Sequence, residues 1–237
     1  MRFWEEGLTF EDRADAGRKL AVKLEAYRDR DDVVVLGIPR GGVVVAFEVA
    51  KALHAPLDIF IARKLGVPWQ EELAFGAIAS GGVRIVDSQI VDAVGVTPEQ
   101  IEIATQVARR ELERRERAYR GMRTALEIEG RTVLLVDDGI ATGSSLRAAI
   151  EAVRQRKPAK LVVAAPVAPE PTCRRLRRYV DDLVCVKTPQ DFFAIAQFYL
   201  DFSPTTDEEV TELLRLAAQE PLEAAEKGRR SHEGVRQ

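Results

Sequence analysis

Two adjacent carboxylates, Asp137 and Asp138, stand between an apolar run and a stretch rich in glycine and hydroxyl residues. The apolar run, 133–136, is typical of a buried strand, and 139–145 reads Gly-Ile-Ala-Thr-Gly-Ser-Ser before a helical pattern begins. Small residues let backbone N–H groups approach a ligand, and a helix N-terminus favours an anion such as phosphate. Carboxylates repel phosphate but accept hydrogen bonds from vicinal hydroxyls. The segment therefore predicts a site for a ribose phosphate.

The spacing of this segment excludes two other phosphate-binding motifs. A Walker loop requires G-x-x-x-x-G-K-[ST], whereas Gly139 and Gly143 are separated by three residues and no lysine follows. The sequence contains no G-x-G-x-x-G, so a dinucleotide-binding turn is unsupported. The remaining alternative is an ordinary turn between a strand and a helix, with two solvent-exposed aspartates.

Composition and charge place the chain among globular proteins. Of its 237 residues, 46% are hydrophobic and 31% are charged, and 35 Lys and Arg against 38 Asp and Glu give a net charge of −3. The apolar runs are far shorter than the roughly 18 residues that a membrane span requires, so no membrane partner is expected. Residues 1–6 turn acidic where a secretory signal would be apolar, and we expect a cytoplasmic protein.

The small number of histidines and cysteines disfavours several kinds of enzyme. The two histidines, His54 and His232, leave no set of ligands for zinc and little basis for a Ser-His-Asp or Cys-His hydrolase. The two cysteines, Cys173 and Cys185, lack a CxxC spacing, and we expect reduced thiols rather than a disulfide.

Short apolar strands that alternate with amphipathic helices must position these residues. The alternation predicts an α/β fold with a doubly wound, mostly parallel sheet, and the two aspartates would lie at its carboxyl edge. The expected strands are 33–38, 57–62, 132–136, 160–166 and 182–187. The expected helices are 10–27, 43–53, 97–122, 146–154, 171–179 and 206–218. A polar loop at 63–72 precedes two strands, 73–79 and 83–86, that follow one another without a helix.

Residues 133–145, Val-Leu-Leu-Val-Asp-Asp-Gly-Ile-Ala-Thr-Gly-Ser-Ser, resemble the signature with which type I phosphoribosyltransferases bind 5-phosphoribosyl-1-pyrophosphate (PRPP). The resemblance covers roughly 10–215, and the chain is most similar to predicted, uncharacterised members. It implies that Asp137 and Asp138 are the catalytic pair that holds the ribose hydroxyls. It further implies that the 5′-phosphate is bound by Gly139, Ile140, Ala141, Thr142, Gly143, Ser144 and Ser145.

The same resemblance implies a pyrophosphate-binding loop after the first core strand. The residues at the matching place are Pro39, Arg40, Gly41 and Gly42. Glycine permits close approach to a ligand and unusual backbone angles, and family members often hold a cis or strained peptide here, so we expect one near Arg40. By itself, Arg-Gly-Gly is equally consistent with a plain turn.

A mobile loop closes over the leaving group in this family, and the polar stretch 63–72 is the candidate here. Arg63 and Lys64 open it and could neutralise the departing pyrophosphate, while a closed loop would exclude water. The alternative is an ordinary surface loop with a salt-bridged pair.

The implied reaction displaces pyrophosphate from C1 of PRPP by a nitrogen nucleophile, as in purine or pyrimidine salvage. Mg²⁺ is expected to enter with PRPP rather than through direct protein ligands. Ala141 stands where hypoxanthine–guanine enzymes carry an acidic residue, which disfavours a 6-oxopurine acceptor. Phe192 or Phe193 could stack on the acceptor ring, with packing in the core as the alternative. A second hypothesis is a regulatory protein that binds PRPP without catalysis.

The resemblance implies one domain over 1–219, with a helical insertion at about 88–126 and a charged tail at 220–237. A small hood would be formed by about 188–219 together with the N-terminal segment. Within the insertion, Thr97, Pro98 and Gln100 predict a capped helix start. Seven Arg against three Glu in 109–123 predict a solvated, salt-bridged face, with RNA or a protein partner as alternatives. Nucleic acid is not the expected partner, and a homodimer stays open.

Overall fold

The structure is a computed structural model that describes residues 9–67 and 69–219, and the predicted tail 220–237 lies outside the described residues. Its centre is a five-stranded sheet in which every neighbouring pair is parallel. In spatial order the strands are β2 (Leu57–Ile59), β1 (Val33–Gly37), β6 (Thr132–Val136), β7 (Lys160–Val167) and β8 (Asp182–Lys187). The predicted doubly wound parallel sheet is confirmed.

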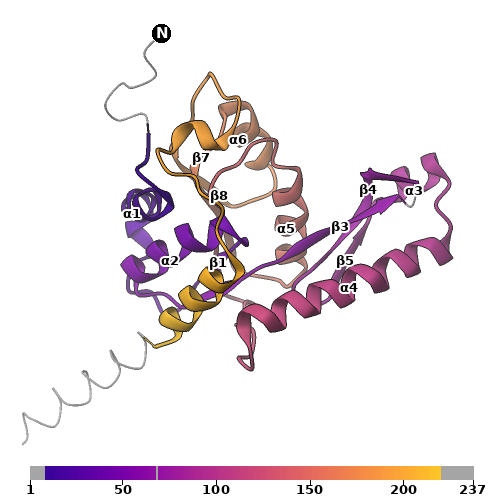
Figure 1. Cartoon of the computed structure of the whole chain (residues 1–237), viewed down its shortest axis with the longest axis horizontal. Coiled ribbons are helices and arrows are strands. Elements are labelled where there is room, and N and C mark those ends of the chain that lie inside the picture. The colour runs from indigo at the N-terminus through magenta and orange to yellow at the C-terminus, as the bar shows by residue number, and fades with distance from the viewer. Residues whose placement is uncertain (1–8, 68, 220–237) are drawn as a thin grey trace, which may run out of the picture.

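Helices cover both faces of this sheet, as Figure 1 shows. Alternate side chains of β1 enter two separate hydrophobic clusters, because successive residues of a strand point to opposite faces. Val33 and Val35 pack in the cluster that contains α2 (Gly41–Leu53), and Val34 and Leu36 pack in the cluster that contains α5 (Ser144–Gln155). Two further helices, α1 (Arg13–Lys23) and α6 (Glu170–Leu176), complete the two layers.

A second sheet and two helices form an arm, residues 62–120, that projects away from the parallel sheet (Figure 1). Its strands pair antiparallel in the order β3 (Ala62–Val67), β4 (Gln70–Ala79) and β5 (Val83–Val86). Two helices follow, α3 (Ser88–Val94) and α4 (Pro98–Arg120).

The expectation of a polar loop at 63–72 is wrong, because the described part of this stretch forms β3 and the start of β4. In β3, Arg63 and Lys64 are exposed whereas Leu65 and Val67 are buried, so the strand keeps only a short apolar signal at its end. Pairing with β4 satisfies the backbone of these polar residues. Tertiary pairing therefore decides the structure of a stretch whose composition indicates a loop.

The start of α4 is as predicted. The Thr97 hydroxyl accepts a hydrogen bond from the Gln100 backbone N–H at 3.3 Å, and the Gln100 side chain accepts one from the Thr97 N–H at 2.8 Å. The predicted first helix is shorter than expected, since α1 ends at Lys23 and a 3₁₀ turn, η1 (Glu25–Tyr27), follows.

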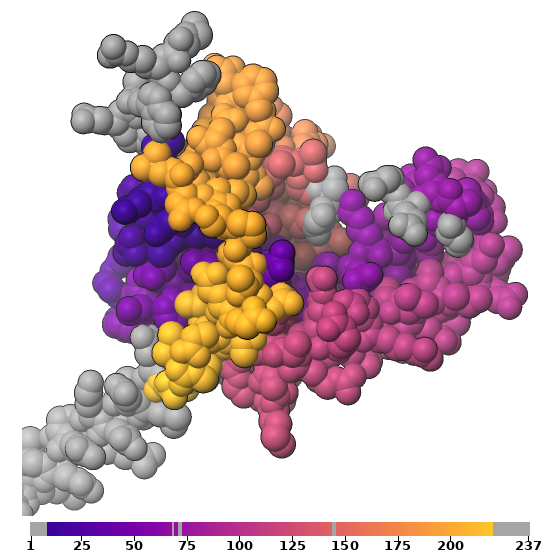
Figure 2. All heavy atoms as spheres, viewed as in Figure 1, coloured from indigo at the N-terminus to yellow at the C-terminus, as the bar shows by residue number. Residues whose placement is uncertain are grey.

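The hood lies across the front of the molecule, as Figure 2 shows for its orange and yellow residues. It contains the 3₁₀ turn η2 (Ile195–Phe198), an extended stretch and a helix at 207–219. Phe10 forms a parallel bridge to Tyr199, which joins the N-terminal segment to the hood. Among the described residues, no helix combines the length and the apolar character needed to cross a membrane.

Candidate active site

The acidic pair follows β6 directly, at the carboxyl edge of a strand with neighbours on both sides. The Asp137 backbone N–H donates to the Ala164 carbonyl at 3.2 Å, which ties the end of β6 to β7. The Asp138 N–H then donates to Oδ1 of Asp137 at 2.9 Å. Ligands bind at the carboxyl ends of strands in open α/β sheets, so the position suits a site.

The two carboxyl groups differ in their electrostatics. Protein atoms crowd Asp137, and this desolvation, followed by the negative charge of Asp138, raises the pKa of Asp137 to about 8. Asp138 instead bonds to a cation, with Arg13 Nε at 2.7 Å from Oδ2. Burial and the adjacent carboxylate thus favour the protonated form of Asp137.

The loop after the acidic pair is anchored by buried residues and leaves its tip open. Ile140 is buried and its N–H donates to the Val167 carbonyl at 2.9 Å, whereas Ala141 and Thr142 are exposed. Gly143 has φ of +75°, which a side chain would disfavour, and α5 begins immediately after it. A helix of this length offers unpaired N–H groups to an anion at its start.

Helix α6 supports the loop from behind. The Thr172 hydroxyl donates to the Ala141 carbonyl at 2.9 Å. Arg175 donates to the Thr142 carbonyl at 3.4 Å and to the Thr172 hydroxyl oxygen at 3.0 Å, so a cation stands beside the tip of the loop. Ser144 and Ser145 begin α5, and their side chains lie outside the described part of the structure.

The predicted pyrophosphate loop touches the acidic pair. A Cβ on Gly41 would overlap Oδ2 of Asp138, and a Cβ on Gly42 would lie 2.9 Å from Cα of Asp137. Glycine at both positions is therefore needed for this approach. The peptide between Pro39 and Arg40 is cis, which confirms the expectation of an unusual peptide here. Two segments far apart in sequence thus form one site.

Among the described residues, the other two predicted sets form no hydrogen bond or ion pair with the acidic pair. Arg63 and Lys64 line a groove of about 690 Å³ between β3 and α4, where Arg63 Nη1 lies 3.9 Å from a carboxylate oxygen of Glu111. Phe192 stacks on Phe198 with ring centroids 5.5 Å apart, which supports the core-packing alternative for Phe192. Phe193 is 87% exposed.

Several residues at the site carry no motif and were not predicted from the sequence. Arg13 comes from α1, and Tyr199 comes from the hood, where its hydroxyl donates to the Asp138 carbonyl at 2.6 Å. Burial, followed by the charge of Asp138, raises the pKa of Tyr199 well above its usual range. Thr172 and Arg175 come from α6. Only the fold brings these residues to the acidic pair and its loop.

Comparison with known proteins assigns the family. The sequence profile of the phosphoribosyl transferase domain matches residues 4–203. A Mycobacterium tuberculosis (strain CDC 1551 / Oshkosh) protein named "Putative phosphoribosyl transferase MT0597" is 45% identical over 215 residues, which are 91% of this chain and 48% of that protein. A second protein of this species, "Putative phosphoribosyl transferase Rv0571c" from strain ATCC 25618 / H37Rv, has the same identity and the same coverage of both chains.

The chain thus spans about half the length of these relatives. The crystal structure of TT1426 from Thermus thermophilus has a TM-score of 0.77 and 40% identity, covering 87% of this chain and 97% of that chain. This likeness agrees with the parallel α/β architecture. By profile, sequence and structure, the chain belongs to the phosphoribosyl transferase domain family.

Proposed function

We propose that the protein is a phosphoribosyltransferase that uses PRPP and Mg²⁺ to transfer the 5-phosphoribosyl group to a nitrogenous, nucleobase-like acceptor, with release of pyrophosphate. The observation that carries the proposal is the contact of the Arg40-Gly41-Gly42 loop with the acidic pair. This contact sets a second glycine loop directly beside carboxylates that are already followed by a phosphate-type loop. PRPP has the matching order of groups, since its ribose diol lies between a phosphate and a pyrophosphate.

Each part of PRPP then has a candidate partner. The diol would form hydrogen bonds with Asp137 and Asp138. The 5′-phosphate would lie on the backbone of 139–145, at the start of α5 and near Arg175, and the pyrophosphate would lie on 39–42. In the reaction, the bond from C1 to the pyrophosphate oxygen breaks, a bond from the acceptor nitrogen to C1 forms, and the acceptor loses a proton. Catalysis would consist of positioning and electrostatic stabilisation.

Mg²⁺ would enter this site with the substrate. Among residues 9–67 and 69–219, no cluster of three or more His, Cys, Asp or Glu side chains could hold a metal ion. Mg²⁺ commonly keeps several waters and binds through substrate phosphate oxygens. When bound to PRPP it would neutralise charge on the departing pyrophosphate, while the acidic pair orients the ribose.

The acceptor would be a flat, partly apolar ring. The hood contains a cavity of about 510 Å³ that could receive such a ring. Its lining includes Pro189, Phe193 and Phe198. Ala141 offers no carboxylate to a base, which favours an acceptor other than a 6-oxopurine.

The proposal is tested by calorimetric titration of the full chain with PRPP and Mg²⁺, followed by an assay of pyrophosphate release with a panel of nucleobases. We expect binding by the wild type, no binding by Asp137→Asn/Asp138→Asn, and release that depends on one class of base. Asp31→Asn, an exposed aspartate elsewhere, is the control and should bind normally. Absence of PRPP binding by the wild type would reject the proposal, and binding without release for any base would favour a regulatory PRPP-binding protein.

A further inference from the structure

Arg13 lies at the centre of the candidate site although it is the first residue of α1. Its Nε donates to Oδ2 of Asp138 at 2.7 Å, and the two side chains are only 11% and 15% exposed. A Cβ on Gly41 would come within 2.6 Å of the same Nε. One guanidinium therefore contacts both the acidic pair and the loop assigned to pyrophosphate.

The hood fixes the other side of this guanidinium. Arg13 Nη1 donates to the Ser203 carbonyl at 2.7 Å, and the centre of the guanidinium lies 3.9 Å from the centroid of the Phe202 ring. Tyr199 packs on Phe202 with centroids 4.9 Å apart and donates to the Asp138 carbonyl. Since the arginine is held by a hydrogen bond, a ring face and an ion pair, it has little freedom to turn away from Asp138.

These contacts determine which carboxylate oxygens stay available. Oδ2 of Asp138 accepts a hydrogen bond from Arg13, and Oδ1 of Asp137 accepts one from the Asp138 N–H. Among the described residues, no other protein donor forms a hydrogen bond with either carboxyl group. One oxygen of each residue is thus left for a hydrogen bond with a ligand, and each hydroxyl of a vicinal diol can donate or accept one.

We infer that Arg13 is a positioning residue that makes the site selective for a ribose with both hydroxyls over its 2-deoxy analogue. It does so by holding the Asp138 carboxylate so that its remaining oxygen and that of Asp137 face one diol. The inference rests on the proposed function, because it assigns the acidic pair to the sugar. A purely structural arginine would instead affect every ligand of the site alike.

The test measures the affinity of the full chain for three ligands with Mg²⁺ by calorimetry: ribose 5-phosphate, 2-deoxyribose 5-phosphate and pyrophosphate, which has no sugar. The wild type should bind the ribose ligand about tenfold more tightly than the deoxy ligand, as one hydrogen bond to a charged acceptor allows. Arg13→Gln should abolish this preference by weakening only the ribose ligand, and Arg13→Lys should restore part of it. Arg18→Gln, a change of the same charge at an exposed position of α1, should behave as the wild type.

The outcomes separate this inference from the proposed function. If the wild type binds none of the three ligands and no PRPP, the proposed function fails and the inference falls with it. If the wild type binds them but does not discriminate, or if Arg13→Gln keeps the preference, the inference alone is overturned. Loss of pyrophosphate affinity in Arg13→Gln would assign a structural role to Arg13 and would also overturn it.

Discussion

The burial of Asp137 beside a second carboxylate lowers the stability of the folded protein at neutral pH. It stands at the end of a central strand, and the cation that contacts the acidic pair, Arg13, bonds to Asp138. Desolvation and the neighbouring carboxylate raise its pKa to about 8 from an ordinary value of 3.8. The folded protein therefore retains a proton that the unfolded chain releases, so the free energy of unfolding should fall as pH rises from about 4 to about 8.

Asp137→Asn should remove this penalty, because the amide is neutral at every pH and has nearly the same shape. We expect the variant and the wild type to be about equally stable at pH 4, and the variant to become progressively more stable than the wild type as pH rises to 8, as measured by urea unfolding. Asp138→Asn is the matched control, and it should lose stability at pH 8 because Arg13 is left without its carboxylate. A wild-type stability that does not fall between pH 4 and pH 8 would contradict the argument.

At this scale the sequence predicts the site only in part. Asp137, Asp138 and the residues that follow them are contiguous, so their chemistry can be seen in one segment. Arg13, Tyr199 and Arg175 belong to three other segments, and no local pattern distinguishes them from other arginines and tyrosines. Their place depends on which helix covers which end of the sheet, and this is a property of the tertiary structure.

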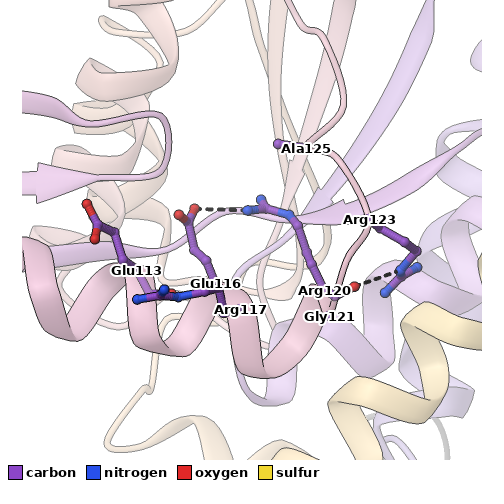
Figure 3. A pocket seen from close by; sticks show the side chains of 7 residues that line it. All are labelled: Glu113, Glu116, Arg117, Arg120, Gly121, Arg123 and Ala125. Atoms are coloured by element: carbon purple, nitrogen blue, oxygen red, sulfur yellow. Dashed lines mark hydrogen bonds and ion pairs between the residues drawn. The ribbon is translucent and has the colours of Figure 1, made fainter.

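Among the elements, α4 is fixed to the body by an ion pair at its last residue. Arg120 Nε lies 2.7 Å from Oδ1 of Asp58 in β2, both side chains are 10% exposed or less, and Arg120 Nη2 donates to the Ile59 carbonyl at 2.9 Å. Figure 3 shows the side chain of Arg120 turned back toward Glu116, whose Oε1 lies 3.0 Å from Nη1. The arm is thus joined to the edge strand of the parallel sheet.

Arg120→Ala should cost about 3 kcal/mol in the free energy of unfolding, because it leaves the buried carboxylate of Asp58 without its cation. The comparison is Arg110→Ala on the same helix, which removes an exposed arginine and should cost less than about 0.5 kcal/mol. Chemical denaturation of both variants measures the difference. Equal stabilities would show that this ion pair does not hold the arm.

The elements themselves follow from sequence more fully than the site does. Short apolar runs between helical segments predict all five parallel strands, and the N-cap of α4 is visible in Thr97 and Gln100. The hairpin of β3 and β4 is not predicted, because the polar residues Arg63 and Lys64 near the start of β3 are typical of a loop. These residues form a strand because their backbone groups pair with β4. The arginines of α4 bind local partners in several cases, as Arg114 and Arg115 do with Glu111, which supports the salt-bridged face.

For the molecule as a whole, the helix at 207–219 closes the core. Val210 and Leu214 are buried in the same hydrophobic cluster as residues of α2 and α4, and the Tyr119 hydroxyl donates to Asp207 at 2.6 Å. The C-terminal part of the hood therefore joins the body to the base of the arm (Figure 2).

Leu214→Ala should destabilise the protein by roughly 2–4 kcal/mol, since it leaves a cavity in this shared core. Leu216→Ala is the control, because it removes the same side chain at a position that is 36% exposed. We expect a smaller loss of stability for this variant. Thermal unfolding and urea titration would report both changes. A similar loss for the two variants would mean that the helix contributes by its formation and not by its packing.

The parallel pairing of β1 with β6 also determines when the site can exist during synthesis. Val33 pairs with Thr132, so the whole arm must be made before these two central strands can meet, and contacts of such long range form slowly. The hydrogen bond between Arg13 and Ser203 forms later still, because Ser203 is synthesised after both of these strands. The arm's own hairpins are local and can form while the chain is still growing, whereas the candidate site is completed only after Ser203 has left the ribosome.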